Sequence, residues 1–381
     1  MPEVAREKQW IPGLDLLRCT AVFLVLIGHA KLFLPHASQD LFKQFFPMPA
    51  AWGVELFFSL SGLLIGQRWV AINLSTDGTV WGKVNQFVRN RWLRTMPTYW
   101  LLLTLLLLIG NINLGSGANL PALLSNLTLT NWITGTSYAL PVSWTLAIEE
   151  FSYLLIGSSV LITLPLLQSR NPQLRRRWLP IFPTLLVLIG EVIRINAVQT
   201  GHWQDFIHSP WYRLDALAYG LLLACFLSPQ QLTTTSRNLW SRPWLPTLAV
   251  TCLLVLQQLR CSLVLNQKLS SPDDGMVFGV LLLPAIGIVT STWVLLASAW
   301  RGSGSKLLDR AIQHLARISY SVYLIHIPLR TYMLQQWTSA TAFSGFLLFC
   351  CFITLSIFLG SINYRLLEKP FLNLRQHLDR L

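Results

Sequence analysis

Runs of about 20 apolar residues, the length that spans the hydrocarbon core of a bilayer, recur along the whole 381-residue chain. Only 12% of the residues are charged, whereas a soluble domain has about a quarter. A protein whose surface mostly faces lipid shows this shortage of charge. The sequence therefore predicts an all-α, polytopic integral membrane protein.

We expect about ten transmembrane helices and a single domain. The apolar runs fall approximately at residues 14–34, 51–69, 97–112, 144–167, 179–195, 211–227, 244–260, 276–300, 317–337 and 343–363. The first run carries charged residues and is too long for the apolar part of a cleavable signal peptide, so we expect it to be retained as a helix. The connecting segments are short, so residues 1–381 are expected to form one transmembrane domain without an attached soluble domain.

The net charge of +13 does not indicate a nucleic-acid partner, because the basic residues form short clusters between the apolar runs. Lysine and arginine are enriched in the cytoplasmic loops of membrane proteins. If the N-terminus is cytoplasmic, the clusters at 89–94 and 175–177 and most other basic residues fall on the cytoplasmic side. Both termini are therefore predicted to be cytoplasmic.

The six cysteines are scattered, without a C-x-x-C pair or a Cys/His spacing typical of a zinc site. They are interpreted as small packing residues, and no metal site is expected.

Ionisable side chains inside a membrane span are costly and by default suggest function. Arg18 and His29 lie eleven positions apart in the first span, which is about three helical turns and about 16 Å along one face. Arg18 is placed to bind an anion near the cytoplasm, and His29 to carry out proton chemistry near the outer side. The alternative is that Arg18 pairs with Asp15 and that His29 bonds to another helix.

Carboxylates in two further spans are predicted to lie at a depth similar to that of His29. Glu149 lies about 8 Å from the expected outer end of the span 144–167, and Glu55 is at a comparable position. A carboxylate beside His29 would orient the imidazole and raise its basicity, which suits a general base. For Glu55 and Glu150 the alternative is a structural bond between helices.

Arg91 and Arg94 would share a helical face, and arginine forks suit phosphate groups. Arg89 is interpreted as an ordinary cytoplasmic charge. In the span 317–337, His326 is expected near mid-membrane with Tyr323 one turn before it. The alternative for His326 is a bond between helices.

Seven segments follow one another along the chain: GLDLLRCTAVFLVLIGHA, GVELFFSLSGLLIG, RNRWLRTMPTYWL, SWTLAIEEFSYLL, WYRLDALAYGLLLA, ISYSVYLIHIPL and LEKPF. In this order they resemble the motifs of the acyltransferase-3 family of bacterial membrane proteins, and the resemblance covers nearly the whole chain. Glu55 stands where the family commonly has Asp, and Thr145 where it commonly has Ser.

The resemblance implies an enzyme of the bacterial cytoplasmic (inner) membrane. Such an enzyme moves an acyl group, usually acetyl, from cytoplasmic acyl-CoA to a hydroxyl of a glycan or related acceptor at the outer side. Carried over by position, the donor-binding residues would be Arg18, Arg91 and Arg94, and the catalytic residues His29 and Glu149. Further polar groups of the substrate site would be Glu55, Glu150, Tyr323 and His326.

A polytopic transporter or exporter is the main competing interpretation, because buried His, Glu and Arg residues also build proton relays. Against it, the sequence shows no inverted repeat of the kind found in many transporters. A non-catalytic membrane scaffold would not need so many embedded charges. Membrane lipid and a hydroxyl-bearing acceptor are the expected partners, and the oligomeric state is left open.

Overall fold

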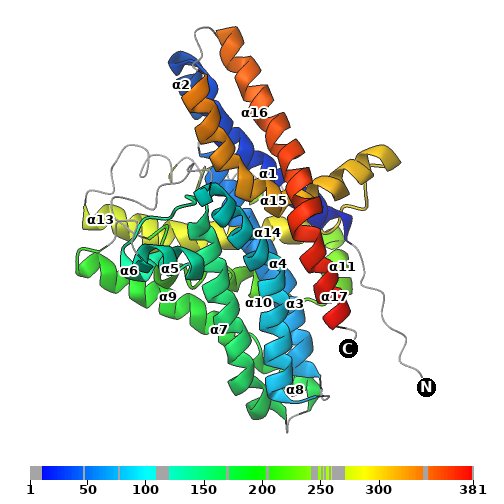
Figure 1. The fold of residues 1–381 in the computed structure, drawn as a ribbon. Coiled ribbons are helices and arrows are strands. Elements are labelled where there is room, and N and C mark those ends of the chain that lie inside the picture. The colour runs from blue at the N-terminus through cyan, green and yellow to red at the C-terminus, as the bar shows by residue number, and fades with distance from the viewer. Residues whose placement is uncertain are drawn as a thin grey trace.

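The computed structural model describes residues 11–45, 48–75, 78–108, 120–168, 171–202, 206–241, 271–337 and 342–379, together with 248, 249, 252, 255, 256 and 259. In this part of the chain every regular element is helical and there is no strand, as predicted. Figure 1 shows α1, α15 and α16 side by side, next to the helices that follow α1 in the chain.

The long helices are α1 (Pro12–Ala30), α3 (Pro49–Leu74), α4 (Val80–Leu108), α7 (Ser143–Gln168), α9 (Ile181–Gln199), α14 (Leu283–Ala297), α15 (Lys306–Gln336) and α16 (Ala342–Asn363). The shorter α-helices are α2 (His36–Phe45), α5 (Leu120–Thr128), α6 (Asn131–Thr134), α8 (Pro172–Trp178), α10 (Ala218–Phe226), α11 (Pro229–Trp240), α13 (Pro272–Gly275) and α17 (Lys369–Leu378). Tighter or wider helical turns form η1 (Lys31–Phe33), η3 (Pro210–Arg213), η4 (Met276–Leu282) and η5 (Tyr364–Glu368).

Six helical stretches of the described chain are long and apolar enough to cross a membrane. They are Pro12–Phe33, Pro49–Leu74, Ser143–Leu167, Gln173–Gln199, Pro272–Ala297 and Phe343–Leu378. Each coincides with a predicted span. A seventh results if the segments Pro210–Phe226 and Pro229–Trp240, which are bent by 95°, form one broken span.

The predicted number of ten spans is not confirmed. α4 covers the described part of the predicted span 97–112, and α15 covers residues 317–336 of the predicted span 317–337. Their mixture of apolar and charged residues does not identify them as spans by composition. The predicted span 244–260 lies largely outside the described residues. The cytoplasmic position of both termini stays a prediction.

The third predicted span begins earlier than expected. α4 starts at Val80, and Pro97 lies inside the helix rather than at its start. Membrane helices tolerate an internal proline when neighbouring groups satisfy the backbone around it. The Tyr320 hydroxyl donates a hydrogen bond of 2.7 Å to the carbonyl oxygen of Thr95, which joins α15 to α4 two residues before the proline. Because α4 is longer than predicted, Arg91 and Arg94 lie within the helix.

α3 is the central helix, in contact with α1, α7, α10 and α14. Its crossing with α10 brings the two backbones together, because a Cβ atom at Gly62 would collide with the carbonyl oxygen of Leu217 and one at Gly220 with that of Ser59. On the opposite side, Gly53 packs in the same way against the backbone of α1. Only glycine fits at these crossings, which fix α3 between its two neighbours.

A buried ion pair joins α3 to η3. Arg213 donates to both carboxylate oxygens of Glu55, with distances of 3.1 Å from Nη1 to Oε1 and 2.7 Å from Nη2 to Oε2. Both side chains are buried. Glu55 was predicted as a polar group of the substrate site. The observed contact is the structural bond that was its alternative, and Glu55 does not line the pocket described below.

Replacing Glu55 with alanine is expected to destabilise the protein by about 3–5 kcal/mol, because it leaves the buried Arg213 charge without its partner. The thermal unfolding midpoint in detergent measures this loss. Asp273→Ala is the control, since Asp273 is exposed. If the two variants unfold at the same temperature, the ion pair does not stabilise the fold.

Candidate active site

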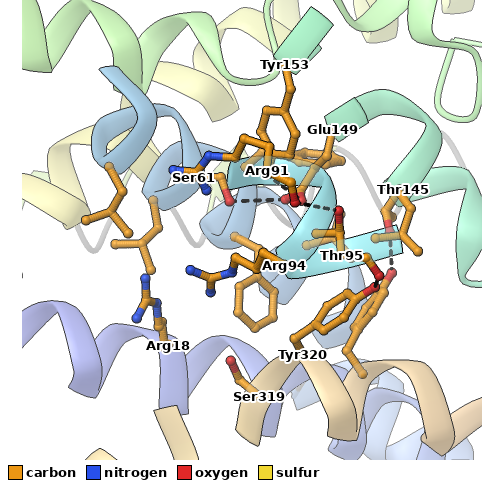
Figure 2. Close-up of a pocket in the computed structure, with 17 residues that line it drawn as sticks. Arg18, Ser61, Arg91, Arg94, Thr95, Thr145, Glu149, Tyr153, Ser319 and Tyr320 are labelled. Atoms are coloured by element: carbon orange, nitrogen blue, oxygen red, sulfur yellow. Dashed lines mark hydrogen bonds between the residues drawn. The ribbon is translucent and has the colours of Figure 1, made fainter. Parts of the chain in front are cut away.

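A pocket lies between α1, α3, α4, α7 and α15. Four charged side chains line it: Arg18 from α1, Arg91 and Arg94 from α4, and Glu149 from α7. All four are predicted site residues, and the fold brings them together from distant parts of the sequence. Figure 2 shows the three guanidinium groups on one side of the pocket and Thr145 on the opposite side.

The three arginines differ in their partners. Arg18 pairs with Asp15 over 3.6 Å, as its structural alternative predicted, and also faces the pocket. The Arg91 side chain is buried, with its guanidinium carbon 5.4 Å from the centre of the Tyr153 ring. Within the described part of the chain, Arg94 makes neither a hydrogen bond nor an ion pair. Its N–H groups are therefore available to an anion in the pocket.

Glu149 does not contact His29, and that prediction was wrong. Its carboxylate accepts hydrogen bonds from the hydroxyls of Ser61, at 3.1 Å, and Tyr153, at 2.7 Å. The prediction measured depth from the start of the span, as if that start lay at the membrane surface. α7 instead begins inside the bundle, because Ser143 is fully buried. Glu149 lines the pocket together with the three arginines.

His29 belongs to a second polar group, at the end of α1 opposite to Arg18. Nη1 of Arg330 donates a hydrogen bond of 2.9 Å to Nδ1 of His29. The His29 and His326 rings lie 5.1 Å apart, with 43° between their planes. His326 is fully buried, and its ring is 5.4 Å from that of Tyr323. The second group thus contains two imidazoles and a guanidinium in place of the predicted histidine–carboxylate pair.

Tyr323 connects the two groups. It lines the pocket, and its hydroxyl lies 2.8 Å from that of Thr145, while its ring contacts His326. Tyr323 therefore contacts both the arginine pocket and the second polar group. The pocket encloses about 90 Å³, which is small for a whole nucleotide.

Glu150 lies outside the pocket. It is buried, and its carboxylate accepts a hydrogen bond from the Thr95 hydroxyl of α4. This contact joins α7 to α4, which is the structural bond given above as its alternative.

Arg330 is the functional candidate that the sequence did not reveal, because by position it is only one more charge at an outer helix end. A signal was nevertheless present. Tyr323, His326 and Arg330 follow one another at spacings of three and four residues, so they share one face of α15. The contact with His29 joins residues 301 positions apart, which no local pattern shows.

The sequence model of a family described as an acyltransferase domain matches residues 11–364. This protein belongs to the acyltransferase-3 family. The resemblance carried by the seven motifs is thereby confirmed, and the protein is an acyltransferase, a transferase of groups other than amino-acyl groups. The family and the apolar helices together make it a multi-pass membrane protein. Comparison with curated proteins and with solved structures finds no match.

All of the acyltransferase's predicted site residues lie inside the matched range. The structure places five of them around one pocket: Arg18, Arg91, Arg94, Glu149 and Tyr323. The two histidines form the neighbouring group, and the remaining two glutamates hold helices together. The roles of the individual residues stay predictions.

Proposed function

We propose that this acyltransferase moves an acyl group, most simply acetyl, from cytoplasmic acyl-CoA to a hydroxyl of a glycan or related acceptor. The acceptor lies at the outer side of the bacterial cytoplasmic membrane. The observation that carries the proposal is the placement of two polar groups at the two ends of α1. Arg18 shares its pocket with the guanidinium groups of Arg91 and Arg94. His29, about 16 Å further along the helix, lies beside the imidazole of His326 and the guanidinium of Arg330.

The arginine group is proposed to bind the donor. Charge-assisted hydrogen bonds from planar guanidinium forks suit the phosphates of acyl-CoA. Arg94 contributes N–H groups that have no other partner in the described chain. Glu149 lines the same pocket as the arginines, and its negative charge would offset part of their positive charge before the donor arrives. Because the pocket is narrow, the nucleotide would remain toward the cytoplasm while the thioester arm enters.

His29 is proposed as the general base. It removes the proton of the acceptor hydroxyl while the hydroxyl oxygen attacks the thioester carbonyl. The new carbon–oxygen bond forms, the carbon–sulfur bond breaks, and the thiolate of CoA takes up the proton. An alternative route through a transient acyl-histidine would use the same imidazole as a nucleophile. In both routes the acyl group, and not the whole donor, passes to the outer side.

The proposal predicts transfer of label from one side of a bilayer to the other. Liposomes containing the protein are loaded with radiolabelled acetyl-CoA, and polysaccharide isolated from the surface of the producing cells is added outside. Label should become covalently bound to the polysaccharide while an equal amount of free CoA thiol appears inside. Liposomes without protein are the control. Passage of an intact labelled solute without release of CoA thiol would contradict the proposal and indicate a transporter.

A further inference from the structure

His326 carries a buried hydrogen-bond acceptor without a partner. Its Nδ1 lies 2.6 Å from the carbonyl oxygen of Tyr323. Because a carbonyl oxygen can only accept, Nδ1 holds the hydrogen and the lone pair of the neutral ring is on Nε2. This Nε2 atom is buried and has no hydrogen-bond partner among the described residues. Buried polar atoms are nearly always paired, so the exception needs an explanation.

His29 carries the complementary hydrogen. Its Nδ1 receives the hydrogen bond from Nη1 of Arg330. Since a guanidinium can only donate, Nδ1 of His29 holds a lone pair, and the neutral ring carries its hydrogen on Nε2. The centres of the two imidazole rings lie 5.1 Å apart. One ring therefore has an N–H group and its neighbour a lone pair, each on Nε2.

A purely structural role does not account for the free acceptor. The alternative predicted for His326 was a hydrogen bond to another helix. Its hydrogen bond in the described chain stays within α15, because Tyr323 is three residues earlier on the same helix. This contact fixes the ring orientation and directs no bond to a neighbouring helix. The bond to the Tyr323 carbonyl also fixes the tautomer of His326, in which Nε2 is the acceptor.

We infer that His326 is the positioning residue of His29 and that its Nε2 accepts the Nε2 hydrogen of His29 during acyl transfer. The inference rests on the proposed role of His29 as the base. When the acceptor hydroxyl takes the place of Arg330 at Nδ1, its proton passes to Nδ1 and its oxygen bonds to the carbonyl carbon. The carbon–sulfur bond breaks, and the proton then leaves His29 for the CoA thiolate.

In this arrangement His326 does the work that a carboxylate does in a serine-hydrolase triad. It holds the base in one tautomer and stabilises the imidazolium that forms. A neutral imidazole suits this place, because a further unpaired carboxylate inside the membrane would be costly. His326 acts through His29 and does not itself have to reach the substrate, in accord with its full burial.

A pair of substitutions tests the acceptor directly. His326→Gln keeps a carbonyl oxygen near the position of Nε2, whereas His326→Leu has similar bulk and no acceptor. We expect His326→Leu to lower kcat about 100-fold, with the KM for acetyl-CoA unchanged. His326→Gln should keep kcat within about tenfold of the unsubstituted protein. Neither variant keeps the imidazole Nδ1–H group that bonds to the Tyr323 carbonyl, and only His326→Gln offers an acceptor in its place.

The control is His314→Leu, on the same helix but exposed, which should leave kcat unchanged. Acetyl-CoA binding and thermal unfolding are measured for each variant to separate chemistry from folding. If His326→Leu does not fold, His326→Asn replaces it, because its shorter amide cannot reach the Nε2 position. The inference is overturned if His326→Leu, or His326→Asn in its place, has the kcat of the unsubstituted protein. It is also overturned if His326→Gln is as slow as His326→Leu. Either result leaves the proposed function intact, whereas an unsubstituted protein that transfers no acetyl group overturns the proposed function itself.

Discussion

His29→Ala is expected to lower kcat for acyl transfer by about 1,000-fold, within the range that a general base contributes. Binding of acetyl-CoA should be unchanged, because His29 lies at the other end of α1 from Arg18 and does not line the arginine pocket. Initial rates of CoA thiol release measure the first effect. Equilibrium binding of labelled acetyl-CoA to the purified protein measures the second.

The exposed His314 provides the control, and His314→Ala should behave as the unsubstituted protein does. A His29→Ala variant that is present at normal levels and retains its full rate would remove His29 from the chemistry. Loss of acetyl-CoA binding in this variant would instead place His29 at the donor site, contrary to the proposed division between the two ends of α1.

Arg94→Ala is expected to raise the Kd for acetyl-CoA about 10- to 100-fold, the value of one charge-assisted hydrogen bond to a phosphate. Arg94 is the most direct choice among the three arginines. Arg18 also pairs with Asp15, and Arg91 packs on Tyr153, so their removal disturbs other contacts. The kcat at saturating acetyl-CoA should stay near that of the unsubstituted protein. Titration of acetyl-CoA at several salt concentrations measures the effect, which should be largest at low ionic strength.

Arg310→Ala removes an exposed arginine of α15 and serves as the matched control. An equal change in Kd for the two variants would mean that general positive charge, and not the pocket, attracts the donor. An unchanged Kd for Arg94→Ala would exclude this side chain from the donor site.

The helices of this fold could be predicted from the sequence wherever a run of about 20 residues is mainly apolar and carries few charges. The six spans identified in the structure are of this kind. α4 was predicted to start too late because its first half carries Arg89, Arg91 and Arg94 and so does not have the composition of a span. Composition reports the contact of a helix with lipid. It does not report a helix that turns its charges toward the inside of the protein.

The site was predictable in its residue types but not in its contacts. Charges inside spans pointed to Arg18 and Glu149, and both line the pocket. The contact of Glu149 was predicted wrongly because spacing counts residues along a helix and does not show which neighbouring helices a side chain meets. The partner of His29 could not be found from sequence, since Arg330 approaches it only through the packing of α15 on α1.

The close helix contacts at the glycines of α3 oppose a transport mechanism in which two halves of the protein move against each other. Alternating access requires two halves of a carrier to rock about a central site. At Gly62 and Gly220 the backbones of α3 and α10 touch, and at Gly53 α3 touches α1. Small residues at helix interfaces permit the closest packing of membrane helices. A rocking motion between α3 and α10, or between α3 and α1, would therefore separate main chains that are in contact. The close contacts at these glycines therefore favour a helical frame that stays fixed, as the proposed transfer of an acyl group alone requires.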